Sequence, residues 1–191
     1  FINANIDAMQ LWVAAGGHLL INAAPNVGDG MDFGFDGVHL DYPWYASTVS
    51  ASDPTHPVWD GPFVPTSTDM TGFNYAHASI SGAYLSPILF DAATPSRIIC
   101  AERNYGAGTV IFGSMTVTDF HTPLTEAGNF RKNLIAYLAT CTISNDDVGV
   151  YSIESPETGC GMTDEEIVTI KVKNYGFLPQ TDVPVYYQAD G

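Results

Sequence analysis

The sequence has very few basic residues, and this scarcity argues against several classes of partner. Its 191 residues include six Lys and Arg against 21 Asp and Glu, a formal net charge of −15, and the first basic residue is Arg97. Such an acidic surface repels phosphate backbones and anionic lipid headgroups. We therefore expect no nucleic-acid binding. Solubility in a salty extracellular medium is the simplest reason for the charge.

Long apolar runs are missing as well. None approaches the roughly 20 residues that a transmembrane helix needs, so no membrane insertion is expected. The hydrophobic content of 46% is nevertheless ordinary for a globular protein, which argues against disorder. The chain opens with Phe1-Ile2-Asn3 and shows no signal peptide. We expect targeting information and part of the first domain to precede Phe1.

Cysteine is scarce too, with only Cys100, Cys141 and Cys160. No C-x-x-C pair is present, which leaves no basis for a zinc or thioredoxin-type site. Cys100 lies in an apolar run and is expected to be a buried strand residue. Cys141 and Cys160 flank an apparent domain junction. If the protein is exported, they are candidates for a disulfide with each other or with a cysteine beyond Gly191.

The first part of the chain contains helix-like and strand-like segments. A helix is expected over 3–15, because apolar residues recur there every three or four positions and Gly16-Gly17 can end it. The short apolar run 18–22 follows directly, which suits a buried parallel strand. Segment 23–44 is rich in Gly, Asp and Asn and is expected to be mostly loop.

A β-hairpin and a closing helix are the clearest local units. Strand-like segments 98–101 and 109–112 flank Gly106 and Gly108, which permit a tight turn. Apolar residues then recur with a period near 3.6 across 127–139, which predicts a helix. Further short strands are expected at 47–51, 76–80 and 85–90.

Near residue 147 the periodicity changes from 3.6 to 2, after a short polar segment that marks a domain boundary. Strands are expected at 148–151, 168–173 and 183–187, which is typical of the start of an antiparallel sandwich. Three strands are too few to close a two-sheet core. The second domain is therefore expected to be cut short at Gly191.

Residues 3–141 resemble the later part of class I glutamine amidotransferase-like domains, including their trehalose-utilisation-like branch. The matching features are the helix end at Gly16-Gly17, the strand 18–22, the phrase Tyr105-Gly106-Ala107-Gly108-Thr109-Val110, and the closing helix with Asn133-Leu134-Ile135-Ala136-Tyr137-Leu138. The resemblance implies a flavodoxin-like, three-layer α/β domain over residues 1–143, without its N-terminal part.

Residues 147–191 are similar to the Ig-like (CARDB-type) modules of large secreted proteins of gliding, polysaccharide-degrading bacteria. The similar phrases include 166–176 and Val183-Pro184-Val185-Tyr186-Tyr187. The similarity implies a partial all-β sandwich, export by the type IX route and an extracellular or cell-surface location. It also implies a multidomain, adhesin-like or enzyme-accessory architecture. The partners would be other domains of the same chain, or a surface protein or polysaccharide.

The nucleophile that amidotransferase chemistry needs is not at its expected position. It belongs on the turn after strand 18–22, which reads Asn22-Ala23-Ala24-Pro25-Asn26 and holds no Cys or Ser. His121 is the remaining catalytic candidate, with Asp119 and Glu126 as carboxylates nearby in sequence. The family's paired Glu is replaced by Pro123, and a loop or capping role for His121 is the alternative.

Candidate ligand sites are few. No H-x-H or H-E-x-x-H spacing occurs, so transition-metal catalysis is not expected. Asp29, Asp32 and Asp36 are the candidates for Ca²⁺, the one cofactor considered, although they lack the EF-hand order. Six aromatic residues are candidates either for a sugar-binding platform or for burial under long loops: Trp44, Tyr45, Trp59, Phe63, Phe73 and Tyr75.

Two functions follow from these patterns. The missing nucleophile favours a non-catalytic structural or adhesive module of a large secreted or cell-surface bacterial protein. The alternative is a hydrolase or amidotransferase-like enzyme domain acting with His121 and upstream residues, or a carbohydrate-binding accessory domain.

Overall fold

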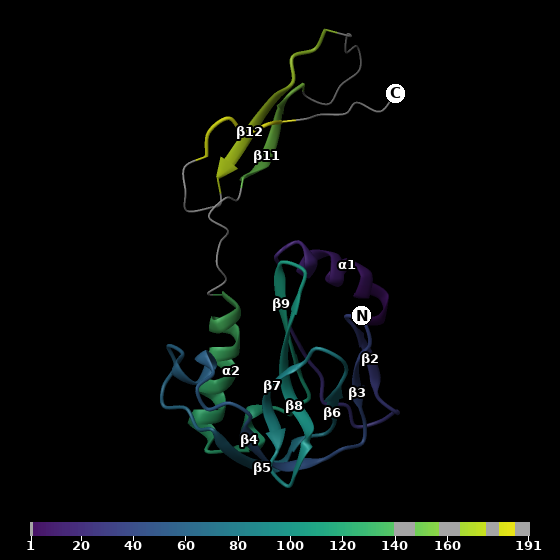
Figure 1. Ribbon diagram of the computed structural model, residues 1–191, viewed down its shortest axis with the longest axis vertical. Coiled ribbons are helices and arrows are strands. Elements are labelled where there is room, and N and C mark those ends of the chain that lie inside the picture. The colour runs from purple at the N-terminus through teal and green to yellow at the C-terminus, as the bar shows by residue number, and fades with distance from the viewer. Residues whose placement is uncertain (1, 140–147, 157–164, 175–179, 186–191) are drawn as a thin grey trace. The chain divides into compact units, whose positions relative to one another are not determined.

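The structure is a computed structural model that describes residues 2–139, 148–156, 165–174 and 180–185. The chain divides into two compact units, Phe1–Cys141 and Thr142–Gly191. The first unit holds two α-helices, two short 3-10 helices and a ten-stranded sheet, whereas the described part of the second holds one two-stranded sheet (Figure 1). No helix in the described ranges is long and apolar enough to cross a membrane.

The helices of the first unit are α1 (Ile2–Ala14), η1 (Pro57–Asp60), η2 (Thr118–Phe120) and α2 (Leu124–Ala139). Its strands are β1 (His18–Asn22), β2 (Met31–Gly34), β3 (Val38–Asp41), β4 (Ala46–Ala51), β5 (Asp69–Ala76), β6 (Ser79–Ser81), β7 (Ser86–Asp91), β8 (Thr94–Tyr105), β9 (Gly108–Gly113) and β10 (His121–Thr122). The strand order is β10-β5-β4-β7-β8-β6-β3-β2, and β9 pairs with both β8 and β1. The long strand β8 therefore joins β7, β6 and β9 along its length.

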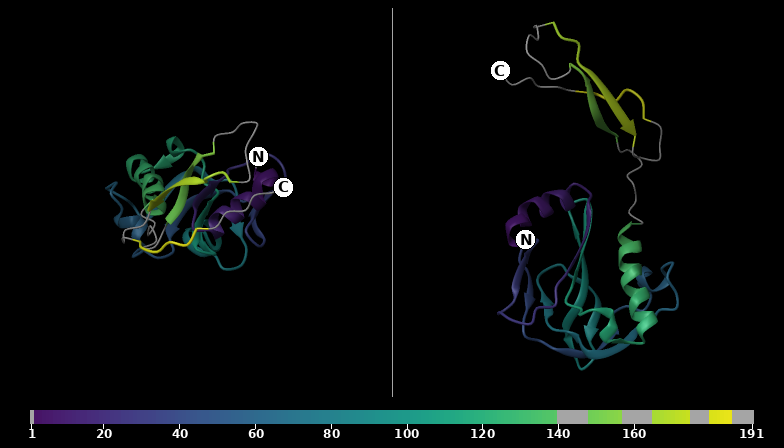
Figure 2. Two further views of the ribbon diagram at one scale, coloured as in Figure 1. Left: turned by 90° about the horizontal axis from the view of Figure 1, so that it is seen from above. Right: turned by 180° about the vertical axis from the view of Figure 1, so that it is seen from behind.

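The pair β1–β9 is parallel, as expected for segment 18–22. Side chains alternate between its two faces. Leu20 and Ile111 enter the core that α2 covers, whereas Ile21 and Val110 enter a second core together with Val13 of α1. The two helices consequently lie on opposite sides of β9, as Figure 1 and the rear view in Figure 2 show.

A flavodoxin-like, three-layer α/β fold is wrong for the first unit. The helix–sheet–helix arrangement is confined to β1 and β9, and the other strand pairs within the described residues are antiparallel. A parallel neighbour needs a crossover of a dozen or more residues, usually a helix. Segment 23–96 has turn residues every few positions and forms no α-helix, so its strands pair as neighbours and hairpins. The expected loop 23–44 itself contains the hairpin β2–β3.

In the second unit, β11 (Val148–Ser155) pairs with β12 (Thr169–Asn174) in antiparallel fashion. None of the described residues of this unit is buried. Of the strand expected at 183–187, residues 183–185 are not in a strand and the rest lie outside the described ranges. The described residues thus form a single hairpin, and the expected opening of a two-sheet Ig-like sandwich is not what the structure shows.

Candidate functional site

The turn that follows β1 is held by backbone pairing and not by a reactive group. Asn22 Oδ1 accepts the Met115 N–H at 3.0 Å, and Asn22 Nδ2 donates to the Met115 carbonyl at 2.9 Å. The Ala23 N–H donates to the carbonyl of Gly113 at 3.0 Å. Because both ends of the Asn22 amide are occupied, this side chain fixes the turn to the segment after β9.

His121 lies on β10 and is only 2% exposed. Its ring stacks on Tyr75 with centroids 3.8 Å apart, and its Nε2 lies 3.0 Å from Thr116 Oγ1 and 3.2 Å from the Tyr75 carbonyl. A carbonyl can only accept, so Nε2 carries the proton. Burial and the Arg131 guanidinium lower the pKa of His121 to about 4, and the ring is neutral at pH 7.

The carboxylates near His121 in sequence are not bonded to it. Asp119 lies in η2 and Glu126 in the first turn of α2. No hydrogen bond or ion pair within the described residues joins either one to the His121 ring. The ring contacts Tyr75 and Thr116, so it packs β10 against β5. A catalytic role for His121 stays a prediction, and the geometry favours packing.

The three aspartates proposed for Ca²⁺ do not converge. Asp32 Oδ1 accepts the Gly34 N–H at 2.7 Å, and Asp36 pairs with Arg103 at 2.7 Å. Asp29 is exposed. Nowhere in the described ranges do three or more metal-binding side chains gather. Calcium binding at these residues stays a prediction without a preformed cage.

Cys100 is the buried strand residue that its apolar neighbours predicted. Burial raises the pKa of its thiol to about 12, so it stays protonated and unreactive at neutral pH. Cys141 and Cys160 lie outside the described residues, and a disulfide between them stays a prediction.

The six aromatic residues divide into two groups. Trp59 and Tyr75 are buried, and Trp59 stacks on Phe130 with centroids 4.8 Å apart. The other four are exposed: Trp44 at 45%, Tyr45 at 47%, Phe63 at 40% and Phe73 at 83%. Burial, one of the two alternatives expected for the set, therefore applies to Trp59 and Tyr75, and a sugar-binding platform stays a prediction for the four exposed residues.

Trp44 is held in place from two directions. Its backbone N–H donates to the His77 carbonyl at 2.9 Å, and the Arg97 guanidinium carbon lies 3.9 Å from its ring centroid. Arg97 Nη1 is 3.8 Å from a carboxylate oxygen of Asp91, which is buried and accepts the Ala93 N–H at 3.0 Å. The indole is thus oriented before any ligand arrives, which reduces the entropy lost on binding.

Tyr45 belongs to a hydrogen-bonded group over the turn after β1. The Tyr42 hydroxyl donates to the Asn26 carbonyl at 2.8 Å and lies 2.9 Å from the Tyr45 hydroxyl, which must therefore donate to it. The Tyr45 ring also meets the His77 ring at 5.3 Å, and His77 Nδ1 donates to the Pro25 carbonyl at 3.0 Å.

We call the group Tyr42, Trp44, Tyr45, His77 and Arg97 the aromatic patch. Among the described residues, no side chain or carbonyl accepts from the Trp44 indole N–H. The Tyr45 oxygen keeps lone pairs, and with its proton on Nδ1 the His77 ring can accept at Nε2. Aromatic faces next to uncommitted donors and acceptors suit a ligand that has both C–H surfaces and hydroxyl groups.

Sequence reasoning found part of this patch. It singled out Trp44 and Tyr45 as aromatics in a loop-rich region, but not Tyr42, His77 or Arg97. One available signal was the run Tyr42-Pro43-Trp44-Tyr45, and another was Arg97 as the first cation of an acidic chain. The contacts of His77 and Arg97 with residues 32 and 53 positions away are set by the sheet and leave no local pattern.

No family model matches this chain, and no curated protein matches it. Solved structures with some likeness include a β-galactosidase from Rahnella sp. R3, at 11% identity and a TM-score of 0.48, over 74% of this chain and 22% of that one. An exo-β-1,4-mannosidase from Opitutaceae bacterium strain TAV5 has 18% identity and a TM-score of 0.40, over 71% and 22%. The cytoplasmic protein STM3548 from Salmonella typhimurium has 15% identity and a TM-score of 0.42, over 70% and 59%.

These findings correct the expected relationships. This chain spans about a fifth of the two glycosidases. The mostly antiparallel sheet with two α-helices overturns the amidotransferase-like assignment, and the single hairpin that the described residues of the second unit form overturns the Ig-like, CARDB-type one. Neither type IX export nor a structural or adhesive module has support from these comparisons.

Proposed function

We propose that this chain is a carbohydrate-binding accessory domain and that the aromatic patch is its binding surface. The observation that carries the proposal is Trp44, an indole that is 45% exposed, fixed by Arg97, and without an acceptor for its N–H among the residues that the structure describes. A solvent-facing aromatic side chain held rigid in this way is typical of a binding surface and not of a core.

The chemistry of the patch selects neutral glycans. The C–H groups on one face of a pyranose ring carry slight positive charge and pack on the electron-rich face of an indole or phenol. The ring hydroxyls can bond the indole N–H, the Tyr45 oxygen and His77 Nε2. A net charge of −15 disfavours polymers that carry carboxylate or sulfate groups.

The carboxylate next to the aromatic patch is consistent with glycan binding and not with glycan cleavage. Hydrolysis of a glycosidic bond takes two carboxyl groups that face it from either side. Asp91, which contacts the patch through Arg97, is 3% exposed and already accepts a backbone N–H. An extracellular location, where polymeric carbohydrate is encountered, is part of the same proposal.

Affinity gel electrophoresis tests the proposal. The chain is run through native gels that contain soluble galactan, mannan or β-glucan, with polygalacturonate as the anionic comparison. We expect retardation by at least one neutral polymer, and a loss of affinity of about tenfold or more in Trp44→Ala. Tyr45→Ala should weaken binding as well.

Phe73→Ala is the matched control, because Phe73 is an exposed aromatic on β5 outside the patch. It should bind like the unmodified chain. Free mobility in all three neutral polymers would overturn the proposal, and so would equal losses in Trp44→Ala and Phe73→Ala. Circular dichroism of each variant shows that the fold is retained.

A further inference from the structure

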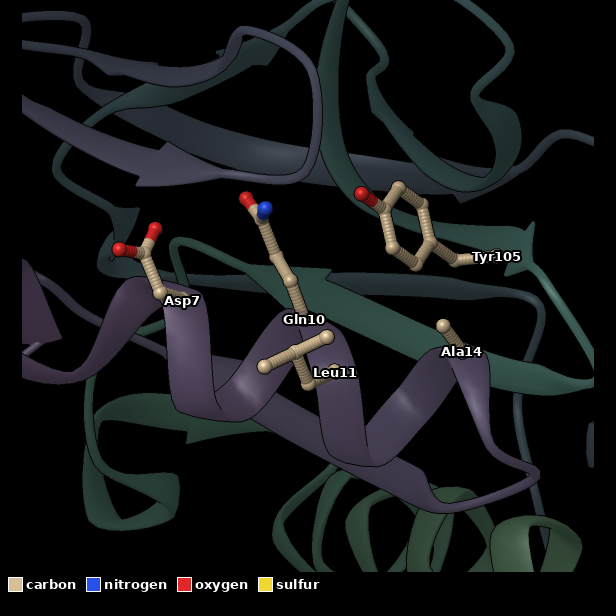
Figure 3. Close-up of a pocket in the computed structure, with 5 residues that line it drawn as sticks. All are labelled: Asp7, Gln10, Leu11, Ala14 and Tyr105. Atoms are coloured by element: carbon tan, nitrogen blue, oxygen red, sulfur yellow. The ribbon is translucent and has the colours of Figure 1, made fainter.

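A pocket of about 380 Å³ lies between α1 and the end of β8. Asp7, Gln10, Leu11 and Ala14 line it from the helix, and Tyr105 lines it from the strand. Figure 3 shows the Asp7 carboxylate, the Gln10 amide and the Tyr105 ring on the side of α1 that faces the strands, with the Tyr105 hydroxyl pointing toward Gln10. The volume is within the range of small-molecule sites.

Three polar groups in this pocket are uncommitted. Gln10 Oε1 accepts the Phe35 N–H, which fixes the side chain and leaves its NH₂ group facing the pocket without a described acceptor. The Asp7 carboxylate has no ion pair or hydrogen bond within the described ranges, and the same holds for the Tyr105 hydroxyl. The pocket thus offers a strong acceptor, a donor pair and a hydroxyl that can serve as either.

The position of the Tyr105 ring is fixed by contacts with Phe35 and Arg103. Its ring meets Phe35 edge-on at 5.1 Å, and the Arg103 guanidinium carbon lies 5.4 Å from its centroid. Arg103 is 5% exposed, donates to the Phe35 carbonyl and pairs with Asp36 at 2.7 Å. One side of the Tyr105 environment is therefore occupied by a buried cation.

These contacts discriminate between ligand charges. An anion would meet the Asp7 carboxylate, and the nearby cation Arg103 is buried and already paired with Asp36. An organic cation would compete with Arg103 for the π-face of a ring that Arg103 already polarises. A neutral polyol meets neither penalty, because its hydroxyls can donate to Asp7 and accept from Gln10 while its C–H face packs on Tyr105.

We propose that this pocket binds one neutral pyranose unit, as a free monosaccharide or as the end of a glycan. Asp7 accepts from two neighbouring hydroxyls, Gln10 Nε2 donates to a ring or hydroxyl oxygen, and Tyr105 supplies the stacking face. The site shares its ligand class with the proposed function and rests on it in that respect only, since it uses none of the residues of the aromatic patch.

Nuclear magnetic resonance titration of the ¹⁵N-labelled chain tests the pocket. D-Glucose, D-galactose and D-mannose are each added to 100 mM at pH 7, with ethanolamine as the cationic probe. We expect at least one sugar to shift the amide signals of residues 7–14 and 105 in a saturable manner. Asp7→Asn should weaken this sugar about tenfold or more, because hydrogen bonds to a carboxylate are the stronger ones.

Asp60→Asn is the control, because it removes an exposed aspartate in η1 outside the pocket. It should leave the titration unchanged, as should Trp44→Ala. The pocket proposal is overturned if no sugar shifts these signals, if ethanolamine shifts them more than every sugar, or if Asp7→Asn binds normally. Loss of polymer retardation in Trp44→Ala with an intact pocket titration separates the two sites.

Discussion

The His121 ring has one nitrogen bonded and the other, Nδ1, buried with no partner within the described part of the chain. Thr116 donates its hydroxyl to the Asn74 carbonyl at 2.9 Å, which leaves its oxygen to accept from His121 Nε2. A proton added at Nδ1 would be buried near Arg131, whose charge opposes it. The folded structure therefore holds this histidine neutral.

We predict that His121 makes the fold less stable in acid. In the unfolded chain a histidine takes up a proton near pH 6.5, whereas in the folded chain burial and Arg131 delay this to about pH 4. The unfolded state binds the proton more tightly in between, so stability is complete above pH 6.5 and falls as the pH drops to about 4. The loss is about 3 kcal/mol by the end of this interval.

Urea unfolding at pH 7.5 and pH 4.5 measures this effect in the unmodified chain and in His121→Gln, which keeps a donor near the Nε2 position but does not titrate. The variant should be less stable at pH 7.5, yet should lose about 2–3 kcal/mol less between the two pH values. Equal losses in both proteins would show that His121 is not the group responsible.

At the residue scale, sequence reasoning identifies chemical types but not neighbours. The sequence marks His121 as a catalytic candidate beside Asp119 and Glu126, yet the ring that it stacks on is Tyr75, 46 positions away. Arg97 and Trp44 are likewise 53 positions apart. Contacts of this kind arise only after the strands have paired, and no local spacing predicts them.

Among the elements, the β8–β9 turn is the part most tightly fitted to another element. The Ala107 N–H donates to the Ala14 carbonyl at the end of α1, at 3.0 Å. A Cβ at Gly106, where φ is +62°, would lie 2.6 Å from Ala14 backbone atoms. A Cβ at Gly108 would lie 2.1 Å from the carbonyl oxygen of Gly17. Glycine is required here because two backbones meet.

We predict opposite effects for two Gly→Ala substitutions. Gly108→Ala should destabilise the fold by about 2–3 kcal/mol, since backbone and not a flexible side chain occupies the space. Gly128→Ala, inside α2 with nothing within 4 Å of the added Cβ, should stabilise it by about 0.5–1 kcal/mol. Thermal unfolding of both variants checks this, and a neutral Gly108→Ala would mean that α1 does not pack against this turn.

A second group of side-chain contacts connects η1 and α2 to the sheet. His56 Nε2 lies 3.4 Å from Glu102 Oε1, and the Tyr137 hydroxyl donates to Glu102 Oε2 at 2.9 Å. These two contacts hold the pKa of Glu102 below its usual range. His56 also accepts the Val58 N–H, which starts η1. The three side chains therefore connect strand β8, helix α2 and the 3-10 helix η1.

Elements with a strong local pattern were predictable from the sequence. Helix α1, strand β1, the hairpin β8–β9 and helix α2 are confirmed within a few residues of their expected bounds. The hairpin β2–β3 was missed because its strands have four residues each, which is too short for the alternation of their apolar residues to stand out. Phe33 stacks on Phe112 of β9 and Phe35 meets the same ring edge-on, and the segment alone cannot reveal either contact.

On the scale of the whole molecule, the fold class was mistaken although several elements were right. Two helices and one parallel strand pair imply an α/β sheet only if the remaining strands also connect through helices. Here the middle of the sequence supplies short antiparallel strands instead. Likewise, alternating residues in the second unit predicted β structure, but alternation cannot tell a lone hairpin from the edge of a sandwich.

We predict that the 191-residue chain unfolds in one calorimetric transition that belongs to the first unit. Two cores of buried side chains lie in that unit, whereas no described residue of the second is buried, and an isolated two-stranded hairpin is marginal in water. The unfolding enthalpy near 60 °C should therefore be about 100 kcal/mol, the value for some 140 residues, and not the roughly 130 kcal/mol expected if all residues unfolded together. A chain that ends at Cys141 should show the same midpoint within about 2 °C. A second transition, or an enthalpy near 130 kcal/mol that falls on truncation, would show instead that residues 142–191 form a cooperative structure of their own or one joined to the first unit.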